Sequence, residues 1–211
     1  MKINPFIVLI FVIVLLSGCA PFQAAGDVQV GREAFVIGKN EDALADFQRA
    51  AKIDPGYVTG AVFPEGVWSY LGRSEYTSGK LRSARQSLER ALAKNKDDHV
   101  ARLYLGLTLA RAGHRRRGLR EIRAGLKGIE DWIDYVNDAF RFSYGQYWDP
   151  TRQIRSEIKS DLAMISSRHF AWSKLIANGE WVGRKVEEEI DLAQRDESQD
   201  MSRDGDSSTM R

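Results

Sequence analysis

The sequence predicts an all-α protein made of helical hairpins that stack as a solenoid. Two observations carry this prediction: apolar and small residues recur with a period of 34, and a glycine stands at the expected turn of each of three copies. In the clearest copy each key residue has a counterpart 34 positions later, without a gap. The pairs are Trp68 and Arg102, Leu71 and Leu105, Gly72 and Gly106, Gly79 and Gly113, Ala84 and Gly118, Leu88 and Ile122, and Ala91 and Gly125.

The first element, residues 1–18, has the pattern of a secretory leader. Lys2 and the amino terminus give a positive start, residues 6–16 are apolar, and Ser17 and Gly18 are small. The apolar run is shorter than the roughly 20 residues that span a bilayer. Leu16-Ser17-Gly18-Cys19 resembles the lipobox of bacterial lipoproteins. This resemblance implies that residues 1–18 are removed as a signal peptide and that Cys19 carries acyl chains such as palmitate.

The next segment, residues 19–23, is predicted to be a short lipidated tether. More than one acyl chain makes a durable membrane anchor. In bacterial lipoproteins an Asp after the lipidated Cys signals retention in the inner membrane, whereas Ala20 stands here. By that resemblance we expect the protein to be anchored in the outer membrane, on its periplasmic face.

Residues 24–132 form the repeat region. Small residues are expected where the two helices of each copy cross, pairing Gly31 with Ala43, Gly72 with Ala84, and Gly106 with Gly118, because they let the backbones approach. A seven-residue insertion, Val58–Pro64, separates the first copy from the second. The pattern resembles the tetratricopeptide repeat, whose signature runs W-x2-L-G-x2-Y, A-x3-F, A and P. The copies depart from it at Asp27 and Arg102, where Trp is usual, and at Glu75, where Tyr is usual.

Residues 133–195 read as further helices that cap the last repeat, and residues 196–211 as a disordered tail. Trp132, Val136, Ala139 and Phe140 share one helical face. Asp149-Pro150 is expected to start a helix, and Asn178-Gly179 to end the one after it. A last helix is expected near residues 181–195, with Val182, Val186 and Ile190 on one face.

The resemblance also implies a protein-binding groove lined by the first helix of each repeat. Its predicted residues are Arg32, Phe35, Arg73, Tyr76, Leu107 and Arg111. Arginines with no acid among the groove positions suit an acidic or C-terminal peptide segment, because a guanidinium binds a carboxylate bidentately. The alternative is that the C-terminal helices fold back into the groove and these residues are packed.

Two further clusters allow two interpretations each. The basic stretch at His114, Arg115, Arg116, Arg117, Arg120 and Arg123 could attract anionic headgroups, phosphate-bearing glycans or an acidic partner, or it could be a solvated helix face. Seven aromatic residues between Trp132 and Trp148 could stack on sugars, or could pack in the core.

Composition excludes several classes of function. The chain has 31 basic and 29 acidic residues and a net charge of +2, which gives no global attraction to nucleic acid. With its only cysteine lipidated, the mature chain has no disulfide and no cysteine-based metal site. Its histidines lack metal-ligand spacing, and it has none of the common catalytic motifs. We therefore expect no enzymatic activity, no metal and no cofactor.

The sequence as a whole indicates a lipid-anchored scaffold that docks envelope proteins. By family resemblance it would serve the assembly or regulation of a cell-envelope complex, as pilotins and murein-hydrolase adaptors do. The alternative is a peptidoglycan- or glycan-binding lipoprotein that uses the aromatic segment 132–148.

Overall fold

The computed structural model describes residues 20–59, 64–142, 144–167 and 170–207. The chain divides into two compact units, and the division falls between Asn95 and Lys96. We call them the N-terminal unit and the C-terminal unit. The division separates the second predicted repeat from the third, so the third repeat belongs with the C-terminal helices.

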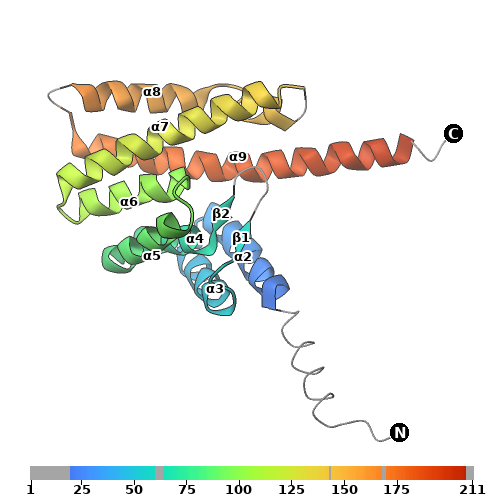
Figure 1. Cartoon of the computed structure of the whole chain (residues 1–211), viewed down its shortest axis with the longest axis horizontal. Helices are drawn as coiled ribbons and strands as arrows, with labels where there is room; N and C mark the ends of the chain where they lie inside the picture. Colours follow the sequence, from blue (N-terminus) through green and yellow to red (C-terminus); the bar gives the residue numbers. More distant parts are fainter. Residues whose placement is uncertain (1–19, 60–63, 143, 168–169, 208–211) are drawn as a thin grey trace, which may run out of the picture. The chain divides into compact units, whose positions relative to one another are not determined.

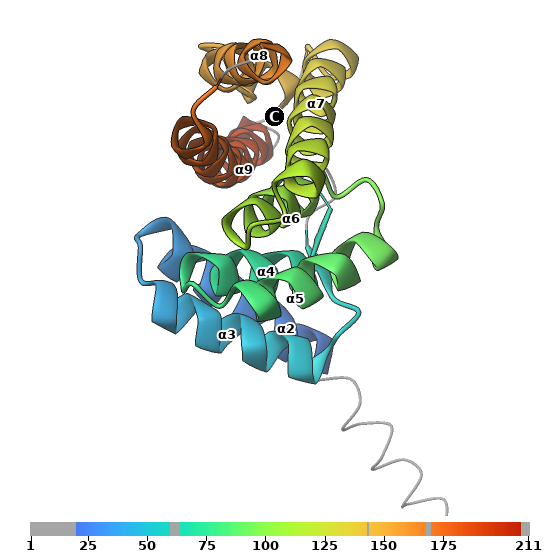
Figure 2. The same ribbon diagram turned by 90° about the vertical axis from the view of Figure 1, so that its left-hand side faces the viewer.

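The N-terminal unit consists of two antiparallel helical hairpins (Figure 2). A short pair of antiparallel strands lies between them, with Val58 opposite Gly66 and Thr59 opposite Glu65. The first two residues of the predicted insertion, Val58 and Thr59, thus pair with the start of the second hairpin. The elements are α2 (Ala20–Val36), α3 (Asn40–Ile53), β1 (Val58–Thr59), β2 (Glu65–Gly66), α4 (Val67–Thr77) and α5 (Leu81–Lys94).

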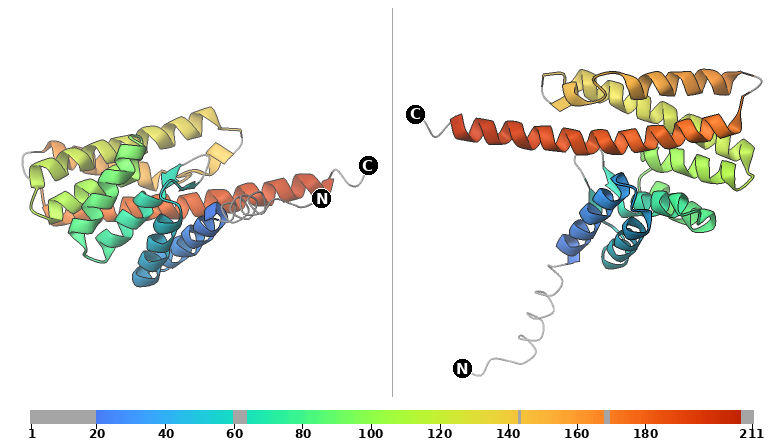
Figure 3. Two further views of the ribbon diagram at one scale, coloured as in Figure 1. Left: turned by 60° about the horizontal axis from the view of Figure 1, so that its bottom comes forward. Right: turned by 180° about the vertical axis from the view of Figure 1, so that it is seen from behind.

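The C-terminal unit begins with a third hairpin and continues into two more helices (Figures 1 and 3). The second helix of this hairpin is much longer than its counterparts, and the last helix is the longest described element. The elements are α6 (His99–Arg111), α7 (Arg115–Ala139), the 3-10 turn η1 (Tyr144–Tyr147), α8 (Gln153–Ser166) and α9 (Trp172–Ser207).

Glycine lets the two helices of each hairpin approach closely, and of the predicted partner residues only Gly118 is among the nearest atoms, with its carbonyl oxygen 2.9 Å from a Cβ atom placed on Gly106. A Cβ atom placed on Gly31 would lie 2.7 Å from the ring of Phe47, and one on Gly72 would lie 2.6 Å from Leu88 Cγ. On Gly106 it would lie 2.4 Å from the backbone nitrogen of Ile122. At Gly106 the close atom belongs to the backbone, so only glycine permits the approach, whereas at Gly31 and Gly72 a side chain would have to move. The all-α hairpin fold predicted from the 34-residue period is confirmed.

The turn glycines are needed for their backbone conformation. Gly38, Gly79 and Gly113 have φ values of +79°, +73° and +89°. This left-handed conformation is open to glycine at little cost and disfavoured for other residues. Each hairpin therefore ends its first helix in the same way, and the register read from the sequence is correct.

The two departures from the repeat's tryptophan are explained by ion pairs. In the second hairpin the Trp68 indole donates to the Pro55 carbonyl at 2.9 Å. At the same place in the first hairpin, Asp27 pairs with Arg49 at 3.2 Å, and in the third, Arg102 pairs with Glu121 at 3.3 Å. The ion pairs join the two helices of their hairpins where the indole would otherwise pack.

Several predicted boundaries differ from the structure. The boundary predicted between residues 132 and 133 falls inside α7, which continues to Ala139. The helix predicted to start at Asp149-Pro150 starts at Gln153. The Asp149 carboxylate still caps it, because it accepts the backbone N–H groups of Ile154 and Arg155 at 3.0 and 3.1 Å.

The largest difference lies in α9. Asn178-Gly179 was expected to end a helix, and residues from Asp196 to be disordered, but α9 runs without a break to Ser207. The Asn178 amide donates to Asp161 Oδ1 at 2.7 Å. A Cβ on Gly179 would lie 3.0 Å from Leu107 Cδ2. These residues therefore mark contacts of α9 with α8 and α6, not a helix end.

Candidate functional site

The four groove residues predicted in the N-terminal unit are buried. Arg73 and Tyr76 are 1% exposed, Arg32 is 5% exposed and Phe35 is 9% exposed. Arg32 and Phe35 lie on α2, whereas Arg73 and Tyr76 lie on α4. The structure thus brings the predicted residues of the first two repeats together, and whether they bind a partner stays a prediction.

Arg73 already binds a carboxylate. Its Nη1 donates to both carboxylate oxygens of Glu65, at 3.1 and 2.9 Å, and Glu65 is itself fully buried. The rings of Phe35 and Tyr70 each lie 5.3 Å from the guanidinium carbon. A buried ion pair needs this kind of support, because removing two charges from water is costly.

No acid stands at the predicted groove positions themselves, but Glu65 supplies one from just outside them. Glu65 lies on β2, directly after the insertion and eight residues before Arg73. An acid directly after the seven-residue insertion, eight residues before a predicted groove arginine, was the signal that could have identified it.

The third repeat uses its equivalent residues differently. Leu107 is fully buried, and α9 crosses it at Gly179. Arg111 lies 3.9 Å from Glu180 of the same helix, with both side chains partly exposed. In the C-terminal unit, α9 therefore covers Leu107, as the fold-back alternative has it, and leaves Arg111 partly exposed.

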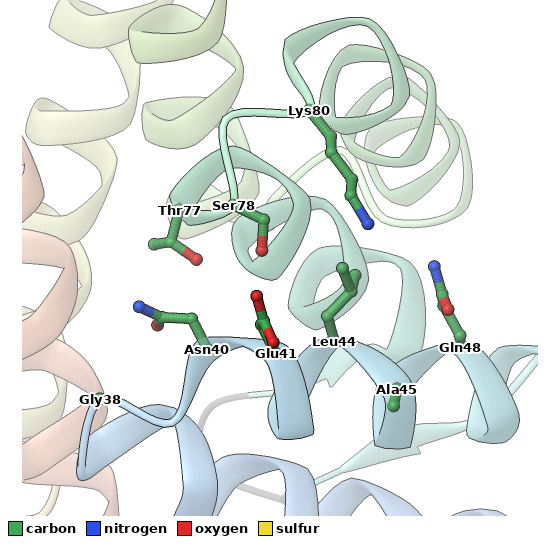
Figure 4. A pocket seen from close by; sticks show the side chains of 9 residues that line it. All are labelled: Gly38, Asn40, Glu41, Leu44, Ala45, Gln48, Thr77, Ser78 and Lys80. Atoms are coloured by element: carbon green, nitrogen blue, oxygen red, sulfur yellow. The ribbon is translucent and has the colours of Figure 1, made fainter.

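The N-terminal unit has an open groove at a different place (Figure 4). It has a volume of about 610 Å³, within the rough range of 300–1,000 Å³ that is common for ligand sites. Side chains of α3 line one side, and the end of α4 with the following turn lines the other. The lining residues are Gly38, Asn40, Glu41, Leu44, Ala45, Gln48, Thr77, Ser78 and Lys80.

The chemistry of this groove is mostly polar. Asn40 and Gln48 supply amides, and the exposed Lys80 extends from the turn toward α3 (Figure 4). On the same hairpin, burial raises the pKa of the Glu75 carboxyl, although the Ser87 hydroxyl and Lys80 favour its charged form. Sequence reasoning missed the groove because it searched the first helix of each repeat, whereas α3 is a second helix.

The described side chains of the aromatic segment differ in exposure and do not share one open cleft. Trp148 is 3% exposed, and its ring packs edge-on against Trp132 with 4.7 Å between centroids. Phe142 and Tyr135 are exposed, at 93% and 62%. The side chain of Tyr144 lies outside the described residues. The placement of Trp148 supports core packing for the centre of this segment.

The lipobox and the predicted leader, residues 1–19, lie outside the described part of the chain. Among the helices that are described, none is both long and apolar enough to cross a membrane. Within the same described ranges, no three His, Cys, Asp or Glu side chains come together as a possible metal site.

Comparison with known proteins identifies the repeat. A family model described as the tetratricopeptide repeat matches residues 71–114, from α4 to the turn before α7. No curated protein matches the chain. The chain therefore contains a tetratricopeptide repeat, as the sequence pattern predicts. Repeats of this kind generally act as non-enzymatic scaffolds that bind protein partners.

Proposed function

We propose that this protein is a lipid-anchored scaffold of the bacterial cell envelope, and that the groove of its N-terminal unit docks a protein partner. The observation that carries the proposal is the open groove between the two helical hairpins of the N-terminal unit, the second of which lies mostly in the region matched by the tetratricopeptide repeat (Figure 4). Stacked hairpins are rigid, so a groove between them presents its polar groups at fixed positions. A partner then binds without ordering its binding site first.

The lining of the groove favours an extended peptide that carries a carboxylate. The amides of Asn40 and Gln48 each have a donor and an acceptor, which match the N–H and C=O groups of a peptide backbone. Lys80 supplies a cation for an acidic side chain or a C-terminal carboxylate. Glu41 on the opposite side selects against peptides that are acidic throughout.

In this proposal the buried arginines support the groove and do not meet the partner. The Arg73 guanidinium on α4 packs against Phe35 of α2, and the Arg32 guanidinium on α2 lies 5.9 Å from the Tyr70 ring of α4. These contacts join the first hairpin to the second. They therefore fix the spacing between α3 and α4, on which the width of the groove depends.

The proposed lipid anchor is based on the lipobox, and the start of α2 determines how far from the membrane the repeats could lie. Because α2 begins at Ala20, the residues between Cys19 and the repeats are helical. Four helical residues span only about 6 Å. A lipidated Cys19 would hold the N-terminal unit close to the headgroups, which favours a membrane-proximal partner. By resemblance, we place the protein in the outer membrane, facing the periplasm, with a pilotin-like or hydrolase-adaptor-like role.

Photocrosslinking in cells tests the groove. A photoreactive residue in place of Gln48, which is exposed in the groove, should capture a partner, and the capture should fall severalfold when Lys80→Glu is added. Lys94→Glu is the matched control, because it makes the same charge change at the other end of α5. A crosslink that is equally strong in both variants, or absent in the parent, would reject the groove as the docking site.

Membrane fractionation tests the anchor independently. Cys19→Ser should leave the helical content unchanged and release the protein from membranes washed with high salt. If Cys19→Ser protein still sediments with washed membranes, the lipid anchor is rejected, while the groove proposal stands on its own test.

A further inference from the structure

Helix α7 carries its charges in the opposite order to the one that stabilises a helix. Its first three turns hold Arg115, Arg116, Arg117, Arg120 and Arg123, whereas its last three hold Asp131, Asp134 and Asp138. The helix macrodipole favours acids at the N-terminus and bases at the C-terminus. The first turn of α7 has no acid and its last turn has no base.

Neighbouring side chains do not compensate for this arrangement. Arg116, Arg120 and Arg123, which we call the basic row, stand three and four residues apart and are all exposed. Like charges at these spacings repel each other. Over the described residues, none of the three has a carboxylate within ion-pair distance. The nearby acid Glu121 pairs with Arg102 of α6 instead. Stability therefore does not account for the basic row.

The geometry of the basic row suits a flat anionic surface. Its three guanidinium groups project from one face of the helix and span about 10 Å along the axis. At the start of α7, Arg115 lies 5.6 Å from the ring of Trp172, and Trp172 packs against Phe170 with 5.1 Å between centroids. The start of α9 thus lies beside the start of α7 (Figure 1).

We propose that the basic row, together with Trp172 and Phe170, binds the phosphate headgroups of an anionic phospholipid bilayer. Guanidinium groups bind phosphate bidentately, and tryptophan favours the boundary between headgroups and acyl chains. A bilayer offers both kinds of contact at one depth, whereas a peptide of acidic residues alone offers no apolar environment for the paired aromatic rings. The inference rests on the proposed function only in that the chain must reach a membrane.

Vesicle co-sedimentation of the full chain tests this proposal. Vesicles of phosphatidylcholine alone are compared with vesicles that contain equal parts of phosphatidylcholine and phosphatidylglycerol. The ratio of the two apparent affinities reports the basic row, because the proposed lipid anchor would insert into both kinds of vesicle. The triple variant Arg116→Gln, Arg120→Gln, Arg123→Gln should lower this ratio roughly 100-fold, since each basic residue near an anionic surface contributes about fivefold.

A matched control removes the same number of positive charges elsewhere. The triple variant Lys52→Gln, Arg82→Gln, Lys94→Gln changes exposed residues of the N-terminal unit and should leave the ratio near that of the parent. Thermal unfolding adds a second readout. The basic-row variant should melt no lower than the parent, because the row does not stabilise α7.

The vesicle experiment distinguishes the basic-row proposal from the proposed lipid anchor. If every variant bound phosphatidylcholine vesicles weakly while the parent still bound the anionic vesicles much more tightly, that result would contradict the lipid anchor and leave the basic-row proposal intact. A parent ratio near one, or equal losses in both triple variants, would overturn the basic-row proposal. It would also be overturned if soluble poly-glutamate, and not the anionic vesicles, bound in a way that depends on the basic row.

Discussion

The N-terminal and C-terminal units bury the same position of the repeat with different side chains and different neighbours. Arg73 and Leu107 occupy equivalent places in successive repeats, 34 residues apart, and both are buried. In the N-terminal unit, Arg73 is neutralised by Glu65 from β2. In the C-terminal unit, Leu107 is covered by α9 at Gly179.

The difference shows that one side chain decides what a repeat surface can accept. A buried guanidinium requires a carboxylate and tolerates aromatic faces, because its charge must be compensated. A leucine requires apolar cover and close approach, which a helix with glycine at the crossing supplies. A repeat position can therefore change from a polar to an apolar contact without any change in the helical hairpin around it.

The largest effect is expected when the buried ion pair of Arg73 and Glu65 is broken or replaced by apolar side chains. Glu65→Gln removes the charge that compensates Arg73, and we expect a loss of about 4 kcal/mol in the free energy of unfolding. The double variant Arg73→Met, Glu65→Leu removes both charges, and we expect it to lose much less. Chemical denaturation of both variants checks this. If the double variant were no more stable than Glu65→Gln, the compensation argument would be wrong.

The apolar packing of α9 against α6 is tested where the two helices cross. A Cβ on Gly183 would lie 2.5 Å from the ring of Tyr104, so Gly183→Leu should separate the two helices and cost about 3 kcal/mol. Arg184→Leu is the control, because Arg184 is the exposed neighbour on the same helix. Thermal unfolding that is equally affected by both substitutions would mean that α9 does not depend on this crossing.

A third comparison uses the hairpin crossings themselves. A Cβ on Gly106 meets the backbone nitrogen of Ile122 at 2.4 Å, whereas one on Gly72 meets mainly the side chain of Leu88. A side chain can rotate away, but backbone cannot. Gly106→Ala should therefore cost about 2 kcal/mol more than Gly72→Ala. Equal unfolding midpoints for the two variants would contradict the difference in packing.

The smallest expected effect is a pH dependence of the C-terminal unit. Burial raises the pKa of Asp161 to about 6, although the Asn178 amide favours the charged carboxylate. Because the folded-state pKa exceeds the unfolded one, this carboxyl stabilises the fold most below pH 4. The contribution is lost as the pH rises through 6. Asp161→Asn should remove this dependence and raise stability at pH 7 by about 1 kcal/mol.

Hydrogen exchange of α8 and α9 peptides between pH 4.5 and pH 7 measures this effect locally. Burial also raises the pKa of Glu189 on α9, so a shallower slope in the same direction should persist in the variant. An unchanged slope in Asp161→Asn protein would assign the pH dependence to other groups.

Local signals predicted the hairpins because those signals are local in the structure too. The turn glycines act through their own φ angles, and the crossing glycines act within one hairpin. The 34-residue register therefore needed no knowledge of distant contacts. The prediction of a helix end at Asn178-Gly179 was wrong for the opposite reason. These two residues contact Asp161 on α8 and Leu107 on α6, which are distant in the sequence.

By itself, the sequence determined the all-α class, the register of three hairpins and the residue types available to each surface. These follow from helix periodicity and backbone sterics, which act over a few residues. Only the tertiary structure decided which groove residues are already occupied and where an open groove lies. Whether Arg73 faces solvent depends on Glu65, and whether Leu107 is covered depends on α9, because burial is set by neighbours that folding brings together from distant parts of the chain.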